Sequence, residues 1–156
     1  MTQNIFKTIS ITDPAIDHST SDIEQFKQTR DLSLINFLPG KTPTYFNLRK
    51  LPLSLKLWIK NREQVGDSYK YLDCFCAGVD SIEGSGSFLN GTNDSITLSP
   101  TKKLKVGKTE LYIWDIDELD PILGERFDVL MEIGSVIWGL LFLKGSTSYK
   151  FPSLDT

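Results

Sequence analysis

The sequence contains few of the residues that build metal sites, redox centres or disulfide frameworks. Its 156 residues include two cysteines and one histidine. Cys74 and Cys76 are one residue apart, which does not match the two-residue spacing of a redox or zinc-binding cysteine pair. We expect both to be buried thiols on a helix of a reduced protein, because free cysteine packs like a small hydrophobic residue. Because His18 is the only histidine, the two-histidine zinc site of an H-E-x-x-H motif is excluded within one chain.

Long apolar runs are also absent. The most apolar stretch, residues 127–143, is interrupted by Asp128 and Glu132. Its uncharged remainder is shorter than the roughly 20 residues that a membrane-spanning helix needs, and it suits a buried helix. Residues 1–14 lack a basic start followed by an apolar stretch, so we expect no signal peptide and no secretion. Together with the reduced cysteines, this predicts a cytoplasmic protein.

With these classes set aside, the composition is typical of a globular domain. Hydrophobic residues make up 40% of the chain, charged residues make up 24%, and the formal net charge is −3. A domain of about 150 residues buries roughly two-thirds of the surface that its unfolded chain exposes. The chain is therefore long enough to form a core without a metal or disulfide.

The first half of the chain predicts short strands and helices. Apolar residues at alternate positions predict a strand or extended arm over residues 5–11. Ser21 and Glu24 match a capping box with Ser21 at the N-cap, and predict a helix that ends near Arg30. An alternating aromatic stretch predicts a strand over residues 44–49.

The second half predicts longer helices and a hairpin. Helical spacing over residues 55–79 predicts one long amphipathic helix, or a pair broken at the glycine near residues 65–67. A short strand is expected over residues 96–98, and two strands that flank Gly107 predict a β-hairpin. Asp120 followed by Pro121 predicts the start of a central core helix, with Phe127 on its buried stripe.

This order of elements predicts an α+β fold. We expect a small mixed domain with two main amphipathic helices, a β-hairpin and extended termini. Residues 1–12 are expected to form the N-terminal strand or arm, residues 13–145 the single α+β domain, and residues 146–156 an extended tail.

The motifs that resemble catalytic sites are better explained as turns. Asp17, His18 and Ser19 are the residue types of a hydrolytic triad, but adjacency in sequence does not supply the triad's geometry. A polar loop with local turn hydrogen bonds accounts for them. Residues 40–42 and 107–109 read Gly-Lys-Thr, yet each lacks the earlier glycine of a phosphate-binding loop. We expect no catalytic residue, no cofactor and no enzymatic activity.

An acidic cluster precedes the last expected helix. Its carboxylates suit Mg²⁺, Ca²⁺ or Mn²⁺, and they belong to Asp115, Asp117, Glu118 and Asp120. The alternative is that acidic residues gather at a helix N-terminus because the helix dipole stabilises them. We favour the alternative, and the sequence leaves open whether Asp115 and Asp117 bind a cation.

Charge is segregated along the chain. Residues 41–70 carry seven basic and two acidic residues, and residues 102–108 add four lysines. Residues 110–132 carry eight acidic residues and one arginine. The basic segments predict, as an alternative function, a small nucleic-acid-binding regulator that uses Lys56, Lys60, Arg62, Lys102, Lys103, Lys105 and Lys108. The negative total charge makes this alternative the less favoured one, because such proteins usually carry net positive charge.

The order of several short motifs resembles the layout of small bacteriophage proteins, with tail assembly chaperones as the nearest named family. The motifs are Asp13-Pro14, Asp17-His18-Ser19, Asp31-Leu32, Pro39-Gly40, Pro43-Thr44-Tyr45-Phe46, Arg49 and Glu132-Ile133-Gly134-Ser135-Val136-Ile137. The β-rich beginning departs from the mainly helical pattern of those chaperones. The resemblance implies a virion component or morphogenesis factor, located in the host cytoplasm or the virion, with no catalytic residues to carry over.

These observations favour a non-enzymatic structural or assembly protein that acts by protein–protein contacts. Its expected partners are other protein subunits, either viral structural proteins or further copies of the same chain. Electrostatic complementarity between segregated charges governs the specificity and rate of such contacts. The termini are the expected contact segments, through Ile5, Phe6, Ile9, Ile11, Tyr149 and Phe151.

Overall fold

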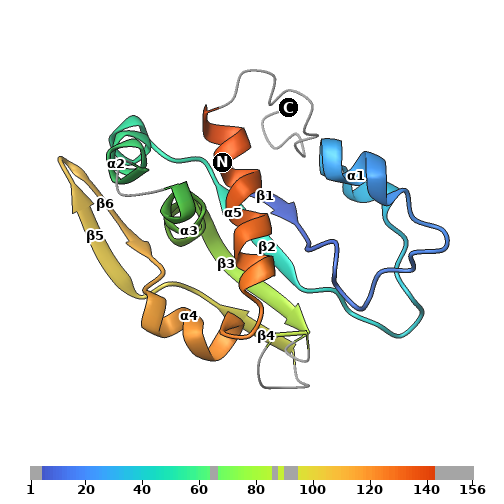
Figure 1. Ribbon diagram of the computed structural model, residues 1–156. Helices are drawn as coiled ribbons and strands as arrows, with labels where there is room; N and C mark the ends of the chain where they lie inside the picture. The colour runs from blue at the N-terminus through green and yellow to red at the C-terminus, as the bar shows by residue number, and fades with distance from the viewer. Residues whose placement is uncertain (1–4, 64–66, 86–87, 90–94, 143–156) are drawn as a thin grey trace.

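The computed structural model describes residues 5–63, 67–85, 88–89 and 95–142. These residues form an α+β fold, which confirms the class expected from the sequence (Figure 1). In chain order the elements are β1 (Ile5–Thr8), α1 (Ile23–Thr29), the 3₁₀ helix η1 (Leu32–Leu34), β2 (Tyr45–Arg49), α2 (Leu53–Glu63), α3 (Asp67–Gly78), β3 (Val79–Ser85), β4 (Ser95–Leu98), β5 (Lys102–Val106), β6 (Thr109–Ile113), α4 (Ile116–Leu123) and α5 (Phe127–Phe142).

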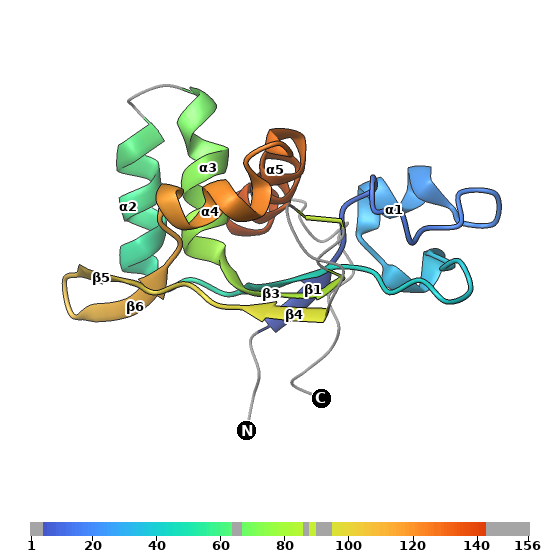
Figure 2. The same ribbon diagram turned by 90° about the horizontal axis from the view of Figure 1, so that it is seen from below.

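The main sheet has the strand order β1-β2-β3-β4, and each neighbouring pair is antiparallel. Alternate side chains of a strand point to opposite faces. Phe6, Phe46 and Ile82 are buried on one face, and α3 and α5 lie on that side of the sheet (Figure 2). On the opposite face Asn47 Nδ2 donates to Glu83 Oε1 at 3.0 Å. The sheet therefore has one apolar face under the helices and one polar face.

Helices α3 and α5 form the centre of the core. They approach closely because Gly134 has no side chain: a Cβ there would lie 2.8 Å from the carbonyl carbon of Tyr71. Phe75 on α3 meets Phe46 on β2 edge to face, with ring centroids 6.0 Å apart. Ile133 on α5 is fully buried. The expected role of the last helix as a core helix is thus confirmed for α5.

The predicted hairpin is present as β5 and β6, a two-stranded unit separate from the main sheet. Its turn contains Gly107 at φ +60°, a conformation that glycine adopts without steric cost. Arg49 at the end of β2 ties the hairpin to the rest of the fold. Its Nε donates to the carbonyl oxygen of Ala77 at 3.0 Å, and its Nη2 donates to the carbonyl oxygen of Tyr112.

Residues 9–44, here called the α1 lobe, connect β1 to β2 and lie to one side of the helical layer (Figure 1). The lobe has its own apolar cluster, which includes the fully buried Phe26 and the nearly buried Ile16. The Asp13 carboxylate closes the lobe by accepting hydrogen bonds from the backbone N–H of Ala15 at 2.9 Å and of Thr44 at 2.8 Å. Burial raises the pKa of Asp13, although these bonds and the charge of Arg126 act in the opposite direction.

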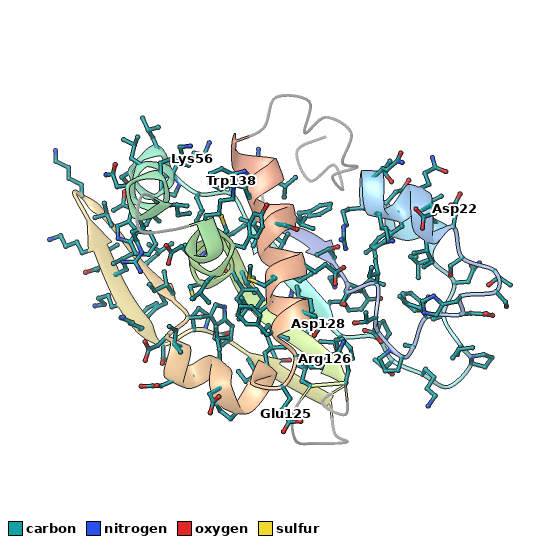
Figure 3. All side chains as sticks on the ribbon, viewed as in Figure 1. Asp22, Lys56, Glu125, Arg126, Asp128 and Trp138 are labelled. Atoms are coloured by element: carbon teal, nitrogen blue, oxygen red, sulfur yellow. The ribbon has the colours of Figure 1, made fainter. Side chains whose placement is uncertain are left out.

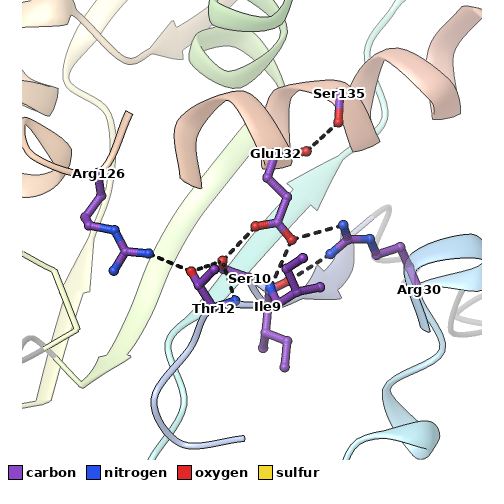
Figure 4. A network of polar contacts seen from close by, with 8 residues as sticks. Ile9, Ser10, Thr12, Arg30, Arg126, Glu132 and Ser135 are labelled. Atoms are coloured by element: carbon purple, nitrogen blue, oxygen red, sulfur yellow. Dashed lines mark hydrogen bonds and ion pairs between the residues drawn. The ribbon is translucent and has the colours of Figure 1, made fainter. Parts of the chain in front are cut away.

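A polar network joins the α1 lobe to α5 (Figure 4). Glu132 Oε1 accepts from Ser10 Oγ at 2.7 Å, and Oε2 accepts from the Ile11 backbone N–H at 3.0 Å. Arg30 Nη2 donates to Oε2 of Glu132, and Arg30 Nη1 donates to the carbonyl oxygen of Ile9, both at 3.0 Å. Two apolar clusters are therefore linked through one nearly buried ion pair.

The structure corrects the expected start of the first helix. The N-cap is Asp22, whose Oδ1 accepts from the backbone N–H of Gln25 at 3.1 Å. Ser21, which the sequence favoured, instead accepts through Oγ from the backbone N–H of Asn36 at 2.8 Å. The serine hydroxyl thus joins two segments of the lobe, and the adjacent carboxylate caps the helix.

The structure also changes two helix boundaries. Residues 55–79 were expected as one helix or a pair, and the pair is present as α2 and α3, while Val79 begins β3. The last helix was expected as one element that starts at Asp120 and includes Phe127, but this stretch contains two helices: α4 begins at Ile116 and contains Pro121 in its final turn, and α5 begins at Phe127. Glu118 Oε1 accepts from the backbone N–H of Asp115 at 3.1 Å, so the helix start is set five residues earlier than the Asp-Pro pair suggested.

Candidate functional site

Helix α2 carries leucines on two opposite sides. Leu55 and Ile59 are fully buried and attach the helix to the core. Leu53 and Leu57 are 70% and 54% exposed. Their spacing of four residues places them on the same side of the helix, one turn apart. The helix therefore presents an apolar pair to its surroundings.

Lysines flank the exposed leucines. Lys56 and Lys60 follow Leu53 and Leu57 by three residues each, so all four side chains share one side of α2. We call these four residues the α2 face. Lys60 Nζ lies 5.0 Å from the ring centroid of Trp138 on α5, a cation–π distance. This contact orients the end of the lysine toward the helical layer.

Two further basic side chains near the α2 face, those of Arg62 and Lys70, contact partners in the fold. Arg62 Nε lies 2.9 Å from Asp73 Oδ2, and its guanidinium carbon lies 5.0 Å from the ring centroid of Trp58. Burial raises the pKa of Asp73 despite the hydrogen bond and charge of Arg62. Lys70 Nζ lies 4.6 Å from the Trp138 ring centroid, on which Lys60 also converges.

The hairpin lies beside α2. Ser54 Oγ on α2 donates to Thr109 Oγ1 on β6 at 2.8 Å, and α2 contacts β5. Lys105 and Lys108 are exposed on the hairpin. The two basic clusters that the sequence predicted are therefore neighbours in the fold, although they are separated along the chain.

Two of the hairpin lysines have carboxylate partners. Lys102 Nζ lies 3.6 Å from Asp115 Oδ1, and Lys103 Nζ lies 3.9 Å from Glu110 Oε1. These are exposed ion pairs, which contribute little to stability but reduce the local excess of positive charge.

Of the expected N-terminal contact residues, Phe6 and Ile9 are buried within the fold. Ile5 belongs to β1, which pairs with β2. Phe6 and Ile9 are buried, in the main core and in the α1 lobe, and Ile11 packs against the lobe cluster. Alternation along the strand places Phe6 beneath the helices, so this segment packs within the fold. The other predicted contact residues, Tyr149 and Phe151, lie outside the described residues.

The candidate catalytic loop is a local turn. Asp17 Oδ1 accepts from Ser19 at both the backbone N–H, at 3.1 Å, and Oγ, at 2.6 Å. These bonds from Ser19 lower the pKa of Asp17. His18 is exposed. The interpretation of these residues as a hydrogen-bonded polar turn is confirmed.

The remaining candidate motifs have structural roles. Gly40 and Gly107 lie in turns at φ +75° and +60°. Cys74 and Cys76 are buried on α3, and burial, with Asp73 and Asp115 nearby, raises the pKa of Cys76 to about 12. The described part of the chain contains no group of three or more His, Cys, Asp or Glu residues arranged to hold a metal ion.

The exposed apolar residues were not singled out by sequence reasoning. Phe127 was expected on the buried stripe of the last helix, but it is 59% exposed because it stands at the first turn of α5, where the chain leaves α4. Ile116 at the start of α4 is 60% exposed. The four-residue spacing of Leu53 and Leu57, out of phase with Leu55 and Ile59, is the signal that could have indicated an exposed pair on α2.

Comparisons with protein families, curated proteins and solved structures found no match to this chain. Among the helices that the structure describes, none combines the length and apolar character that crossing a bilayer requires.

Proposed function

We propose that the protein is non-enzymatic and acts by binding another protein through the α2 face. The observation that carries this proposal is the exposure of Leu53 and Leu57, one turn apart on a helix whose other side is anchored in the core. Burying a leucine side chain is worth about 1.5–3 kcal/mol, and folding of the single chain leaves most of that gain unrealised for this pair. A partner that covers α2 would recover it.

The charges around the pair specify the kind of partner. Protein interfaces typically have an apolar centre and a polar rim. On the α2 face Lys56 and Lys60 supply that rim, and Lys105 and Lys108 on the adjacent hairpin extend it. The face is therefore suited to an apolar surface bordered by carboxylates. The resemblance of short motifs to bacteriophage virion and morphogenesis proteins supports the same class of function.

The test compares partner binding by variants of exposed residues. We would immobilise the wild-type chain, a Leu53→Gln/Leu57→Gln variant and a Thr97→Gln control, which changes an exposed position on the main sheet. Each would be challenged with an extract of the source cells and with the chain itself at matched concentration. The proposal expects a stoichiometric partner that the wild type and control retain and the leucine variant loses. Equal retention by all three proteins, or no binding by any of them, would overturn it.

A second candidate function is supported by the proximity of the two basic clusters. Contact between α2 and the hairpin brings the two basic segments of the sequence together in the fold, as a nucleic-acid surface would require, and Lys60 within the first segment is turned toward Trp138. The test is binding of fluorescent single-stranded and duplex DNA and RNA between 50 and 200 mM salt, for the wild type and Lys105→Glu/Lys108→Glu. Salt-sensitive binding that the charge reversal weakens about tenfold or more would support this function. Binding that is absent at the lowest salt concentration would exclude it.

A further inference from the structure

We propose that the partner of the α2 face is a second copy of this chain, which docks through the surface formed by α4 and the start of α5. This inference rests on the proposed function, because it assigns the partner of the same face. The second surface, here called the α4 face, consists of Ile116, Asp117, Asp120, Glu125 and Phe127.

The α4 face also combines exposed apolar side chains with charge. Ile116 and Phe127 are among the most exposed large hydrophobic residues of the described chain. Asp117, Asp120 and Glu125 are exposed between them along the sequence. The segment from α4 to the start of α5 therefore exposes apolar and acidic side chains, whereas α2 exposes apolar and basic ones.

The nearest arginine does not neutralise the α4 face. Arg126 Nε lies 3.2 Å from Asp128 Oδ1, and Arg126 Nη2 donates to Thr12 Oγ1 at 2.6 Å. The Arg126 guanidinium also lies over the Phe88 ring, with its central carbon 4.9 Å from the ring centroid. These contacts turn it toward the body of the protein and leave Asp117, Asp120 and Glu125 as the charges of the face.

The α2 face and the α4 face do not meet within one molecule. Figure 1 shows α2 and α4 on either side of α3, and Figure 3 shows Lys56 and Glu125 at well-separated places on the helical layer. Between described residues, no ion pair links residues 41–70 with residues 110–132. The charge segregation of the sequence therefore persists in the folded chain as two surfaces of opposite sign.

The separation of the two faces favours a head-to-tail contact, in which each copy uses its α2 face on one neighbour and its α4 face on another. Such contacts close into a ring if the rotation between copies allows it, and otherwise continue as a filament. Opposite charges across the contact would steer association and disfavour pairing of two α2 faces.

The experiment measures mass in solution against protein concentration for variants of each face. One variant carries Leu53→Gln and Leu57→Gln, and the other carries Ile116→Gln and Phe127→Gln. We expect the wild type to form species larger than a dimer, and each variant to need about tenfold or more protein to associate. Circular dichroism and thermal unfolding establish that each variant is folded, since substitutions at exposed positions usually change stability little.

A mixture of the two variants tests the head-to-tail arrangement directly. Each variant retains the face that the other lacks, so an equimolar mixture should form a one-to-one dimer and stop there. Charge-reversal variants provide a second test if an apolar variant fails to fold. Lys56→Glu alone should weaken association, and a chain that carries both Lys56→Glu and Asp117→Lys should associate again. The matched control is Lys41→Glu, an exposed lysine of the α1 lobe.

The outcomes separate this inference from the proposed function. A chain that stays monomeric at every concentration, yet binds another protein through the α2 face, overturns the inference and leaves the proposed function in place. Association that depends on Leu53 and Leu57 but not on Ile116 and Phe127 also overturns it, because two α2 faces would then be in contact. Loss of association with either variant, together with dimers in the mixture, supports it.

Discussion

Arg30 Nη2 lies 3.0 Å from Oε2 of Glu132, and this ion pair connects the end of α1 to the middle of α5. Both side chains are largely withdrawn from solvent. Arg30 also caps α1 with φ +54°, and its guanidinium lies over Phe26, with the central carbon 4.9 Å from the ring centroid. One arginine therefore ends a helix, covers the apolar cluster of its lobe and binds the core helix.

Removing Glu132 should be strongly destabilising. Glu132→Ala leaves the charge of Arg30 and the backbone N–H of Ile11 without their acceptor, and breaking a nearly buried pair costs about 3–5 kcal/mol. Glu132→Gln retains an acceptor oxygen and should cost less. Urea unfolding measures both variants. The control is Asp128→Ala, which breaks an exposed pair with Arg126 on the same helix and should cost about 1 kcal/mol or less. Equal losses for Glu132→Ala and Asp128→Ala would show that the network does not hold the lobe.

Gly134→Ala should loosen the packing of α3 on α5. The new Cβ would collide with the backbone carbonyl of Tyr71, and neither helix can move without disturbing the core. We expect a loss of about 1–3 kcal/mol, measured by thermal or urea unfolding. Gly78→Ala is the comparison variant and should cost less, because its nearest obstacle is the side chain of Ile137 rather than helix backbone. A Gly134→Ala protein at least as stable as the wild type would contradict the close approach.

Cys74 and Cys76 should resist alkylation in the native protein. Burial raises the pKa of Cys76 to about 12. Only about one thiol in ten thousand is then ionised at pH 8, and the thiolate is the reactive form. Mass spectrometry after iodoacetamide treatment should show unmodified native protein and two modifications in 6 M guanidinium chloride. Rapid native labelling at pH 8 would show that α3 is more open than the structure indicates.

Glu83 should make stability depend on pH in the acid range. Hydrogen bonds from Asn47 and Lys7 lower its pKa from the ordinary value of 4.5. Because the pKa of Glu83 is lower in the folded state, the charged carboxylate adds to the free energy of unfolding. This contribution is complete above the unfolded pKa and is lost as pH falls through the folded pKa. The side chain is 38% exposed, so screening limits the effect to about 1 kcal/mol or less.

Comparison with Glu83→Gln would measure this contribution. The wild type should be more stable than Glu83→Gln at pH 7, and the difference should shrink below about pH 4.5. Glu24→Gln, at a side chain that is 84% exposed, serves as the control and should show no such difference. If Glu83→Gln is less stable than the wild type by the same amount at pH 7 and pH 3, the hydrogen bonds do not depend on the charge of Glu83.

Local patterns predicted the parts of the fold that depend on neighbouring residues. The β2 strand and the hairpin at Gly107 follow from alternation and turn chemistry, and the pair α2 and α3 is one of the two alternatives that the helical spacing left open. The single helix expected from Asp120 onward is divided into α4 and α5, and α4 starts earlier because two capping signals, at Asp115 and Asp120, compete within one short segment. Only packing of Leu119 and Leu123 against the core decides between them.

Local sequence patterns could not predict the contacts between residues that are far apart in the chain. The alternation around Phe6 indicated a strand. It could not show that β2 would pair with the edge of this strand, or that the helices would cover its apolar face. Likewise, the spacing in α2 shows two apolar stripes without showing which one the core would bury. The basic clusters could be identified from the sequence, whereas the contact between α2 and the hairpin that makes them neighbours depends on the tertiary fold.

The link between Arg30 and Glu132 has a consequence for the order in which the chain matures during synthesis. The two residues are 102 positions apart, so the ribosome completes the α1 lobe long before it makes α5. Domains generally fold from the N-terminus as they emerge, but this lobe contains an arginine destined for burial whose carboxylate has not yet been synthesised. Final docking of the lobe therefore waits until α5 has been made, and a nascent chain stalled before residue 132 should expose the lobe to protease.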